Sequence, residues 1–144
     1  MKLSTRTRYG VRAIIELAAA DSKKPLQLKI IAQRQDISVK YLEQLMAVLR
    51  SGGIVRSMRG ARGGYILAKP PNQITLSEVF NCLEGPVITA ECVEDEDYCQ
   101  RAADCAARLL WVQVEEAIKN VLHSVTLQDL LDRAKDKRTS DYRI

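Results

Sequence analysis

The chain has 144 residues, of which 47% are hydrophobic and 28% are charged, and it carries a net charge of +4 at pH 7. This composition is typical of a folded globular chain and excludes a disordered one. No apolar run approaches the ~20 residues that span a bilayer, which excludes a transmembrane protein. Because the first residues also lack the apolar core of a signal peptide, we expect a cytoplasmic protein without a membrane partner.

Charge is divided unevenly between the two halves of the chain. Residues 1–69 hold 14 Lys and Arg against 4 Asp and Glu, a net charge of +10, whereas residues 70–144 hold 8 against 14, a net charge of −6. A basic half joined to an acidic half favours a polyanionic partner at the basic end, and nucleic acid is the first candidate. The alternative is a charged surface that contacts only solvent.

The basic half predicts three helices followed by a hairpin. Ser4 and Ser38 are suitable N-caps, and apolar residues recur at helical spacing after each of them. Two short apolar runs joined by a glycine-rich connection then indicate two strands with arginines between them. The predicted helices cover about residues 5–20, 28–34 and 39–51, and the predicted strands cover residues 54–58 and 65–68.

The acidic half predicts a different arrangement. Thr75 and Glu78 form a capping box that opens a helix to about Glu84. Residues 87–104 show no regular period, and the long helix that follows, over about residues 106–123, has apolar residues on more than one face. Thr126 is a suitable cap for a last helix to about residue 135, and we expect the polar tail from Asp136 to fray.

Two short helices separated by a tight turn, followed by a hairpin with a basic tip, describe a winged helix-turn-helix. We therefore predict a mainly α fold with a small β-hairpin wing. The second helix of the pair would enter the major groove, the wing would reach the minor groove or phosphates, and nearby cations would contact phosphates. The candidate DNA-binding residues are Ser38, Lys40, Tyr41, Glu43, Gln44, Arg50, Arg59, Arg62, Arg8 and Lys2. The alternative for each of them is an ordinary surface or packing role.

Four motifs, in the correct order, carry a resemblance to a known family. They are Thr-Arg-Tyr-Gly-Val-Arg-Ala from Thr7, Tyr-Leu-Glu-Gln-Leu from Tyr41, Arg-Gly-Ala-Arg-Gly-Gly-Tyr from Arg59, and Leu-Glu-Gly-Pro from Leu83. Over nearly its whole length the chain resembles the bacterial Rrf2 family of transcription regulators. The resemblance implies a homodimer that binds double-stranded operator DNA, with the long helix near 106–123 as its dimerisation helix.

The resemblance also divides the chain into three segments. Residues 1–69 would form the winged helix-turn-helix domain, residues 70–105 a linker, a short helix and a cysteine-containing loop, and residues 106–144 the dimerisation helix and a C-terminal helix. No nucleophile–base pair, Walker loop or dinucleotide fingerprint is present, so we expect no enzymatic activity.

Three cysteines, Cys92, Cys99 and Cys105, cluster in the irregular segment, and thiolates suit iron–sulfur clusters or zinc. The resemblance implies an iron–sulfur cluster, [2Fe–2S] ahead of [4Fe–4S], on these three thiols. The fourth ligand is unknown, because Arg108 stands where iron–sulfur members of the family carry a histidine. Unliganded thiols or a redox pair remain open. Cys82, on a predicted helix, is interpreted as a buried small residue.

The main hypothesis is thus a DNA-binding regulator, mainly a repressor, that senses iron–sulfur or redox status through a cysteine-ligated cluster. The alternative is a cluster-free repressor of cysteine and sulfur metabolism. Such a repressor would be controlled by thiol oxidation or by a partner enzyme of cysteine synthesis. The C-terminal part of the chain, around Leu110, Trp111 and residues 126–130, resembles the branch of the family that works in this second way.

Overall fold

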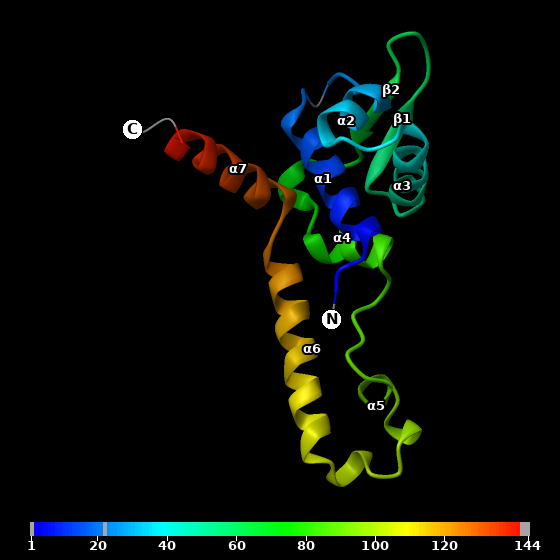
Figure 1. The fold of residues 1–144 in the computed structure, drawn as a ribbon, viewed down its shortest axis with the longest axis vertical. Helices are drawn as coiled ribbons and strands as arrows, with labels where there is room; N and C mark the ends of the chain where they lie inside the picture. The colour runs from blue at the N-terminus through cyan, green and yellow to red at the C-terminus, as the bar shows by residue number, and fades with distance from the viewer. Residues whose placement is uncertain (1, 22, 142–144) are drawn as a thin grey trace.

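The computed structural model describes residues 2–21 and 23–141, with side chains up to residue 138. The N-terminal part forms a trihelical unit and a β-hairpin, and a long helical arm extends from it (Figure 1). The elements are α1 (Thr5–Ala19), α2 (Leu28–Gln35), α3 (Val39–Ser51), β1 (Val55–Met58), β2 (Gly64–Leu67), α4 (Leu76–Leu83), α5 (Glu91–Glu94), α6 (Ala106–Ser124) and α7 (Leu127–Asp141). This is the predicted mainly α fold with a two-stranded wing.

Local signals define the ends of the first three helices. The Ser4 hydroxyl accepts a hydrogen bond from the backbone N–H of Thr7, and the Ser38 hydroxyl accepts one from the N–H of Tyr41, so both act as the predicted N-caps. Asp36 closes α2 in the left-handed conformation with φ of 54°, which starts the tight turn into α3. Gly53, at φ of 74°, lets the chain leave α3 and enter β1.

The hairpin of β1 and β2 is antiparallel and lies beside α3. Val55 faces Leu67 and Arg56 faces Ile66 across the ladder. Tyr65 of β2 also pairs with Leu26, and the two residues exchange both backbone hydrogen bonds at 2.9 Å. The wing is therefore anchored to the segment before α2 near the turn end of its ladder, and the turn between the strands extends beyond this contact (Figure 1).

One hydrophobic core joins the helices of the DNA-binding part to segments from later in the chain. Ile14 of α1, Ile31 of α2 and Leu42 of α3 are fully buried in it. Ile74, Val79 of α4 and Leu127 of α7 complete the core, so the second half of the chain also holds the first half together.

The arm consists of α6 and the segment that runs back along it. Residues 86–105 descend as an irregular segment that contains α5 and two short 3-10 turns. The chain then returns along α6, which has 19 residues (Figure 1). At the corner between α6 and α7 the chain pairs with the residues before α4, through Leu76 N–H to Val125 O at 2.8 Å and Leu127 N–H to Ile74 O at 3.0 Å. These bonds join the arm to the N-terminal domain.

The last helix is longer than its sequence predicts. We expected the helix to end near residue 135 and the tail from Asp136 to fray, but α7 continues to Asp141. The extension carries no apolar stripe, yet its residues include good helix formers and no Gly or Pro, so nothing in the segment interrupts the helix. Among the described residues no helix is long and apolar enough to cross a membrane.

Candidate nucleic-acid interface and cysteine loop

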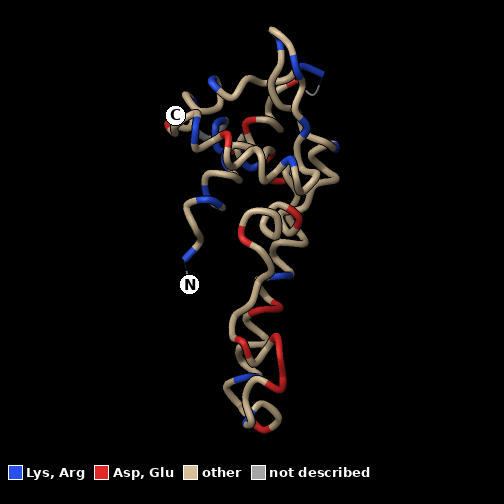
Figure 2. Tube along the Cα trace, turned by 90° about the vertical axis from the view of Figure 1, so that its right-hand side faces the viewer, with Lys and Arg blue, Asp and Glu red and all other residues tan. Residues whose placement is uncertain are grey.

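Positively and negatively charged residues are concentrated in different parts of the molecule. Figure 2 shows Lys and Arg spread over the domain that contains α1 to α3 and the hairpin, whereas Asp and Glu are concentrated along the arm. A basic domain on an acidic arm is suited to bind a polyanion at one end only. The interface is therefore to be sought on the helices and the wing.

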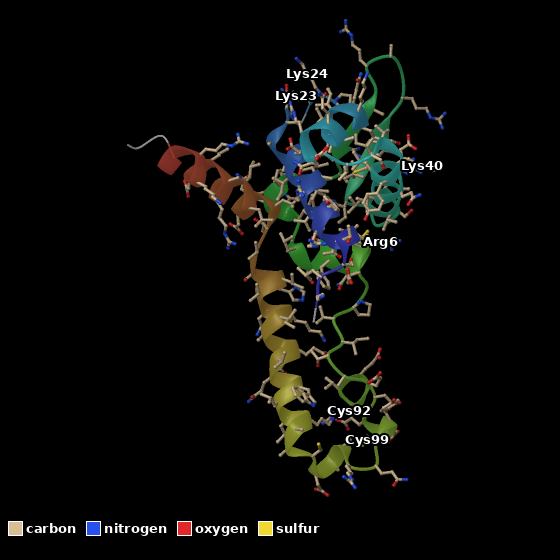
Figure 3. All side chains as sticks on the ribbon, in the orientation of Figure 1. Arg6, Lys23, Lys24, Lys40, Cys92 and Cys99 are labelled. Carbon is tan, nitrogen blue, oxygen red and sulfur yellow. The ribbon has the colours of Figure 1, made fainter. Side chains whose placement is uncertain are left out.

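α3 presents a polar face opposite a buried apolar one. Leu42, Leu45, Met46 and Leu49 are buried and attach the helix to the core. Lys40, Glu43 and Gln44 are exposed, as is the cap Ser38, and Figure 3 shows Lys40 on the outer side of the domain. Four of the predicted base-contacting residues thus lie together near the start of the helix that would enter the major groove.

Tyr41 takes a different position from its neighbours. It is half-buried, and its ring meets the Tyr9 ring edge-on, with centroids 6.2 Å apart and planes at 89°. The Arg12 guanidinium lies 5.1 Å from the Tyr9 ring centre and donates to Gln35 Oε1 at 2.7 Å. Tyr41 therefore has the packing role that the sequence left open, and a contact with DNA remains a prediction.

The wing carries its two arginines at an exposed tip. Arg59 and Arg62 are exposed; Arg59 precedes, and Arg62 lies within, a turn in which Gly63 N–H donates to Gly60 O at 2.9 Å. Gly60 has φ of 113°, and a side chain at Gly63 would collide with the carbonyl oxygen of Met58. Both glycines are thus required by the turn that presents the arginines.

The remaining predicted cations surround this face at some distance. Arg50 is exposed in the last turn of α3, and Lys2 and Arg8 are exposed at the start of α1. In the view of Figure 3, Arg6 lies on the same side of the domain as Lys40. A contact of these side chains with the phosphate backbone rather than with base edges remains a prediction.

The cysteine loop lies at the far end of the arm from the wing. Cys92 is on α5, Cys99 follows the next turn and Cys105 is the N-cap of α6; all three are half-buried free thiols (Figure 3). In the part of the chain that the structure describes, no group of three or more Cys, His, Asp or Glu side chains is arranged to hold a metal ion. The predicted set of three thiol ligands is therefore present on one loop but is not gathered at one point.

Arg108 occupies the interior of this loop. Its Nε donates to the carbonyl oxygen of Cys92 at 2.8 Å, its Nη2 contacts Glu96 Oε1 at 2.8 Å, and only 14% of its side chain is exposed. A guanidinium has no acceptor atom and stays protonated, so it cannot ligate a metal. In this arrangement the residues present do not fit a cluster, and Arg108 holds the loop against α6 instead.

Sequence reasoning missed two polar contacts, one between the end of α4 and the start of α1 and one within the arm. The Glu84 carboxylate, at the end of α4, accepts hydrogen bonds from the hydroxyls of Ser4 and Thr7, and these bonds lower the pKa of Glu84. Glu84 is part of the last family motif, but its partners are nearly 80 residues away, so no local pattern announces the contact. It joins the start of α1 to the segment that leads into the cysteine loop.

The second contact lies within the arm. The Glu115 carboxylate of α6 accepts hydrogen bonds from Lys119 Nζ at 2.6 Å and from the N–H of Thr89 at 3.1 Å, which together lower the pKa of Glu115. The Thr89 hydroxyl also donates to the carbonyl oxygen of Trp111 at 3.1 Å. Glu115 is buried by this contact, and the descending segment is thereby held along one face of α6.

α6 also carries an apolar stripe that the rest of the chain leaves uncovered. Leu110 is 51% exposed and Val121 is 61% exposed, and Leu109, Trp111 and Val114 are exposed as well. Leu110, Val114 and Val121 recur at helical spacing on one stripe. Apolar residues in a stripe of this length are what a partner helix would cover.

Comparison with known proteins decides the family. The family model described as "Rrf2: Iron-dependent Transcriptional regulator" matches residues 3–133. The chain belongs to the Rrf2 family. It is therefore a DNA-binding transcription regulator, as its motifs predicted, and it comes from a family of regulators rather than of enzymes.

Individual relatives cover almost the whole chain. The HTH-type transcriptional regulator CymR of Bacillus subtilis is 45% identical over 130 residues, 90% of this chain and 89% of the relative. The solved structure of CymR, the global cysteine regulator of B. subtilis, has a TM-score of 0.80 at 43% identity, covering 92% of this chain and 98% of that one. The structure of T. potens IscR has a TM-score of 0.78 at 39% identity, covering 95% and 90%. These Rrf2-family structures share the winged helix-turn-helix fold seen here.

Proposed function

We propose that this Rrf2-family protein is a homodimeric repressor of genes for cysteine and sulfur metabolism. The observation that carries the proposal is the similarity to CymR, which extends over 90% of the chain at 45% identity. The arrangement of Arg108 supports it further, because the loop that would hold a cluster is occupied by a guanidinium. In this reading the protein needs no cluster to fold its cysteine loop.

DNA binding follows from the geometry of α3 and the wing. Lys40, Glu43 and Gln44 project from α3 toward the solvent, and Arg59 and Arg62 project from the wing tip. With α3 in the major groove, the wing arginines reach the adjacent minor groove or its phosphates. Arg50, Arg8 and Lys2 add phosphate contacts, which give affinity and salt dependence but no sequence preference.

A homodimer accounts for the surface of the arm. The chain exposes 10009 Å², whereas a compact monomer of its mass exposes about 7,500 Å². The excess, about 2,500 Å², is of the size that obligate dimers bury. Pairing of the α6 stripe with its copy would cover this surface and set two recognition helices at a defined spacing on a dyad operator.

Control is proposed to act through the cysteine loop and the arm. The loop contacts α6 through Arg108, and the descending segment contacts α6 through Thr89. Glu84, at the end of α4 just before that segment, contacts Ser4 at the start of α1. A change in the loop therefore has a physical path to both the dimer helix and the DNA-binding domain. The input is either oxidation of the loop thiols or association with a partner enzyme of cysteine synthesis.

The proposal is tested by DNA-binding measurements on the full-length protein. Fluorescence anisotropy would compare promoter fragments of cysteine-synthesis genes with unrelated fragments of equal length, at one stated salt concentration. Specific binding at least 100-fold tighter than nonspecific binding supports the proposal, and equal binding contradicts it. Addition of purified cysteine synthase, and separately of a thiol oxidant, would then identify the input.

A second candidate function is iron–sulfur sensing, favoured by the presence of three half-buried thiols on one loop. Here Cys92, Cys99 and Cys105 would hold a cluster, [2Fe–2S] ahead of [4Fe–4S], with an unknown fourth ligand. The loop would have to rearrange, because Arg108 now bonds to the carbonyl of Cys92. Iron and sulfide analysis after anaerobic purification separates the two candidates: roughly equal iron and sulfide supports the cluster, and a colourless protein after reconstitution supports thiol or partner control.

A further inference from the structure

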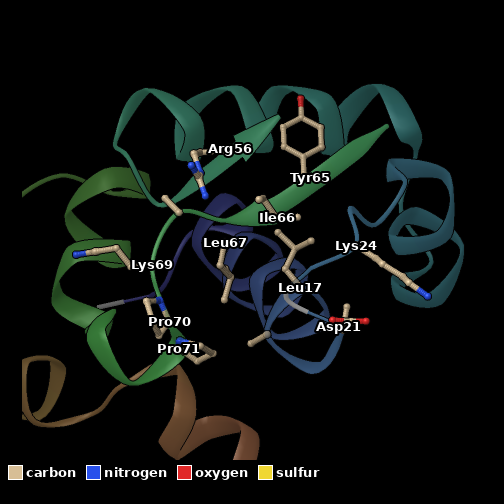
Figure 4. A pocket seen from close by; sticks show the side chains of 13 residues that line it. Leu17, Asp21, Lys24, Arg56, Tyr65, Ile66, Leu67, Lys69, Pro70 and Pro71 are labelled. Carbon is tan, nitrogen blue, oxygen red and sulfur yellow. The ribbon is translucent and has the colours of Figure 1, made fainter. Parts of the chain in front are cut away.

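A cavity of about 290 Å³ lies behind the wing, between the end of α1, strand β2 and the connection that leads to α4 (Figure 4). Leu17 and Ala18 of α1, Leu67 of β2 and Pro71 line it, so the greater part of its wall is apolar. This volume is at the lower limit of the roughly 300–1,000 Å³ that is typical of small-molecule sites. The cavity is a separate feature from the polar face of α3, the wing tip and the cysteine loop.

Four charged residues line this cavity, namely Asp21, Lys24, Lys69 and Arg56, and the Arg56 side chain is also exposed to solvent. Arg56 stands opposite Ile66 in the ladder, both residues line the space, and no hydrogen bond or ion pair of its side chain is found among the described residues. The two lysines of the wall are oriented differently from Arg56. In Figure 4 the amines of Lys24 and Lys69 point outward on opposite sides, and Lys69 is paired with Glu78 at 2.8 Å.

Asp21 is the only carboxylate that lines the cavity among the described residues, and it is already engaged, because its Oδ1 accepts the backbone N–H of Lys23 at 3.0 Å. It lies at the Lys24 end of the cavity, away from Arg56 (Figure 4). The Arg56 guanidinium is thus a cation without an acidic partner, beside an apolar wall. This combination matches a ligand with an anionic head and an apolar body.

We propose that this cavity binds a small organic anion, an aliphatic carboxylate, with its carboxylate on Arg56 and its chain against Leu17, Leu67 and Pro71. Because the walls come from α1, the wing and the connection to α4, a bound anion holds these three segments together. A ligand that binds more tightly when the wing is held than when it moves would shift the protein toward the held state. Ligand binding would thereby change the affinity for DNA. The inference goes beyond the proposed function, and its test contains no DNA.

The test uses octanoate as the probe and two-dimensional NMR of the full-length protein. We expect saturable shifts at Leu17, Ala18 and residues 66–68, with a dissociation constant on the order of 1 mM, the range for ligands of this size. Octanol, which lacks the charge, should bind about tenfold more weakly. Absence of saturable shifts at these residues, or equal binding of octanol, would overturn the proposal.

Matched variants separate the site from general hydrophobic adsorption. Ala18→Leu fills the cavity and should abolish octanoate binding, whereas Ala19→Leu, at the exposed neighbouring position, should leave it unchanged. Arg56→Gln should weaken binding about tenfold, and Arg133→Gln on α7 should not. Retained affinity in both Ala18→Leu and Arg56→Gln, with the variants shown to be folded by their NMR spectra, contradicts the site.

Discussion

The arginines at the wing tip lie on the basic domain, unlike exposed arginines of the acidic arm. Arg59 is presented by a glycine turn on the basic domain, whereas Arg101 is exposed on the acidic arm. We expect Arg59→Ala to weaken operator binding about tenfold and to lower the slope of log affinity against log salt by about 1, without changing the melting temperature. Arg101→Ala is the control and should leave both quantities unchanged; an unaltered salt slope for Arg59→Ala would contradict the wing assignment.

A second residue-scale prediction concerns Glu84 and pH. Hydrogen bonds from Ser4 and then Thr7 lower the pKa of the Glu84 carboxyl from its ordinary value of 4.5. A carboxyl with a lowered pKa stabilises the fold above its ordinary pKa, and this contribution is lost as the pH falls through the folded-state value. Because the group is exposed, we expect Glu84→Gln to destabilise by less than about 1 kcal/mol at pH 7.

Urea unfolding at two pH values checks this expectation. The difference between the wild-type protein and Glu84→Gln should be present at pH 7, should shrink as the pH falls below the ordinary carboxyl value of 4.5, and should vanish once the pH is below the lowered pKa of Glu84 in the folded state. Glu116→Gln, at an exposed position of α6, serves as the matched control. A difference for Glu84→Gln that persisted unchanged at the lower pH would mean that the charge of Glu84 is not what holds α1 to α4.

At the scale of elements, α6 is the part whose role is most open to test. Leu110, Val114 and Val121 lie on one exposed stripe, away from Glu115 and the descending segment. Val114→Asp should weaken dimerisation at least about 100-fold, since it replaces buried apolar area with a charge at the expected interface. The fold of each chain should survive, because Val114 is 40% exposed in the single chain.

Sedimentation analysis at several concentrations measures this effect. Asn120→Asp adds the same charge on another face of α6 and should leave the dimer intact. If Val114→Asp remained dimeric at micromolar concentration, the two chains would have to associate through another surface, and the spacing of the recognition helices would need a different explanation.

Elements with local signals were predictable from the sequence, and contacts between distant segments were not. The caps Ser38 and Thr75 and the glycine turn of the wing act within a few residues, and the structure confirms each of them. The prediction that the last helix ends near residue 135 was wrong, because a polar helix without an apolar stripe gives no periodic signal. The contact of Glu84 with Ser4 joins residues 80 apart and has no local pattern at all.

For the candidate site too, the residue types were predictable from the sequence and their contacts were not. The composition of the wing and of α3 indicates which side chains are polar, but not that Tyr41 turns inward onto Tyr9. The three cysteines are visible as a spacing, yet the position of Arg108 inside their loop depends on how α5 and α6 meet. Residue type therefore predicted the chemistry available, and packing decided how it is arranged.

At the scale of the whole molecule, the protein is a basic domain and an acidic arm joined by a few defined contacts. The wing and α3 lie at one end and the three loop thiols at the other (Figure 1, Figure 3). The segment between them is bonded to α6 through Thr89 and Arg108, and Glu84, at the end of α4 just before that segment, is bonded to Ser4 at the start of α1. Such an arrangement lets a chemical event at the loop change the setting of two recognition helices, provided that two chains share α6.

The central claim, that the cysteine loop controls operator binding, is tested most directly by one comparison. Operator affinity would be measured by anisotropy for the wild-type protein and for a triple variant with Cys92→Ser, Cys99→Ser and Cys105→Ser, each with and without the thiol oxidant and the partner enzyme. We predict that the wild-type affinity changes at least about tenfold with one of these inputs, a coupling of about 1.4 kcal/mol, and that the folded, dimeric triple variant does not respond. A triple variant that responded as strongly as the wild type would contradict the claim.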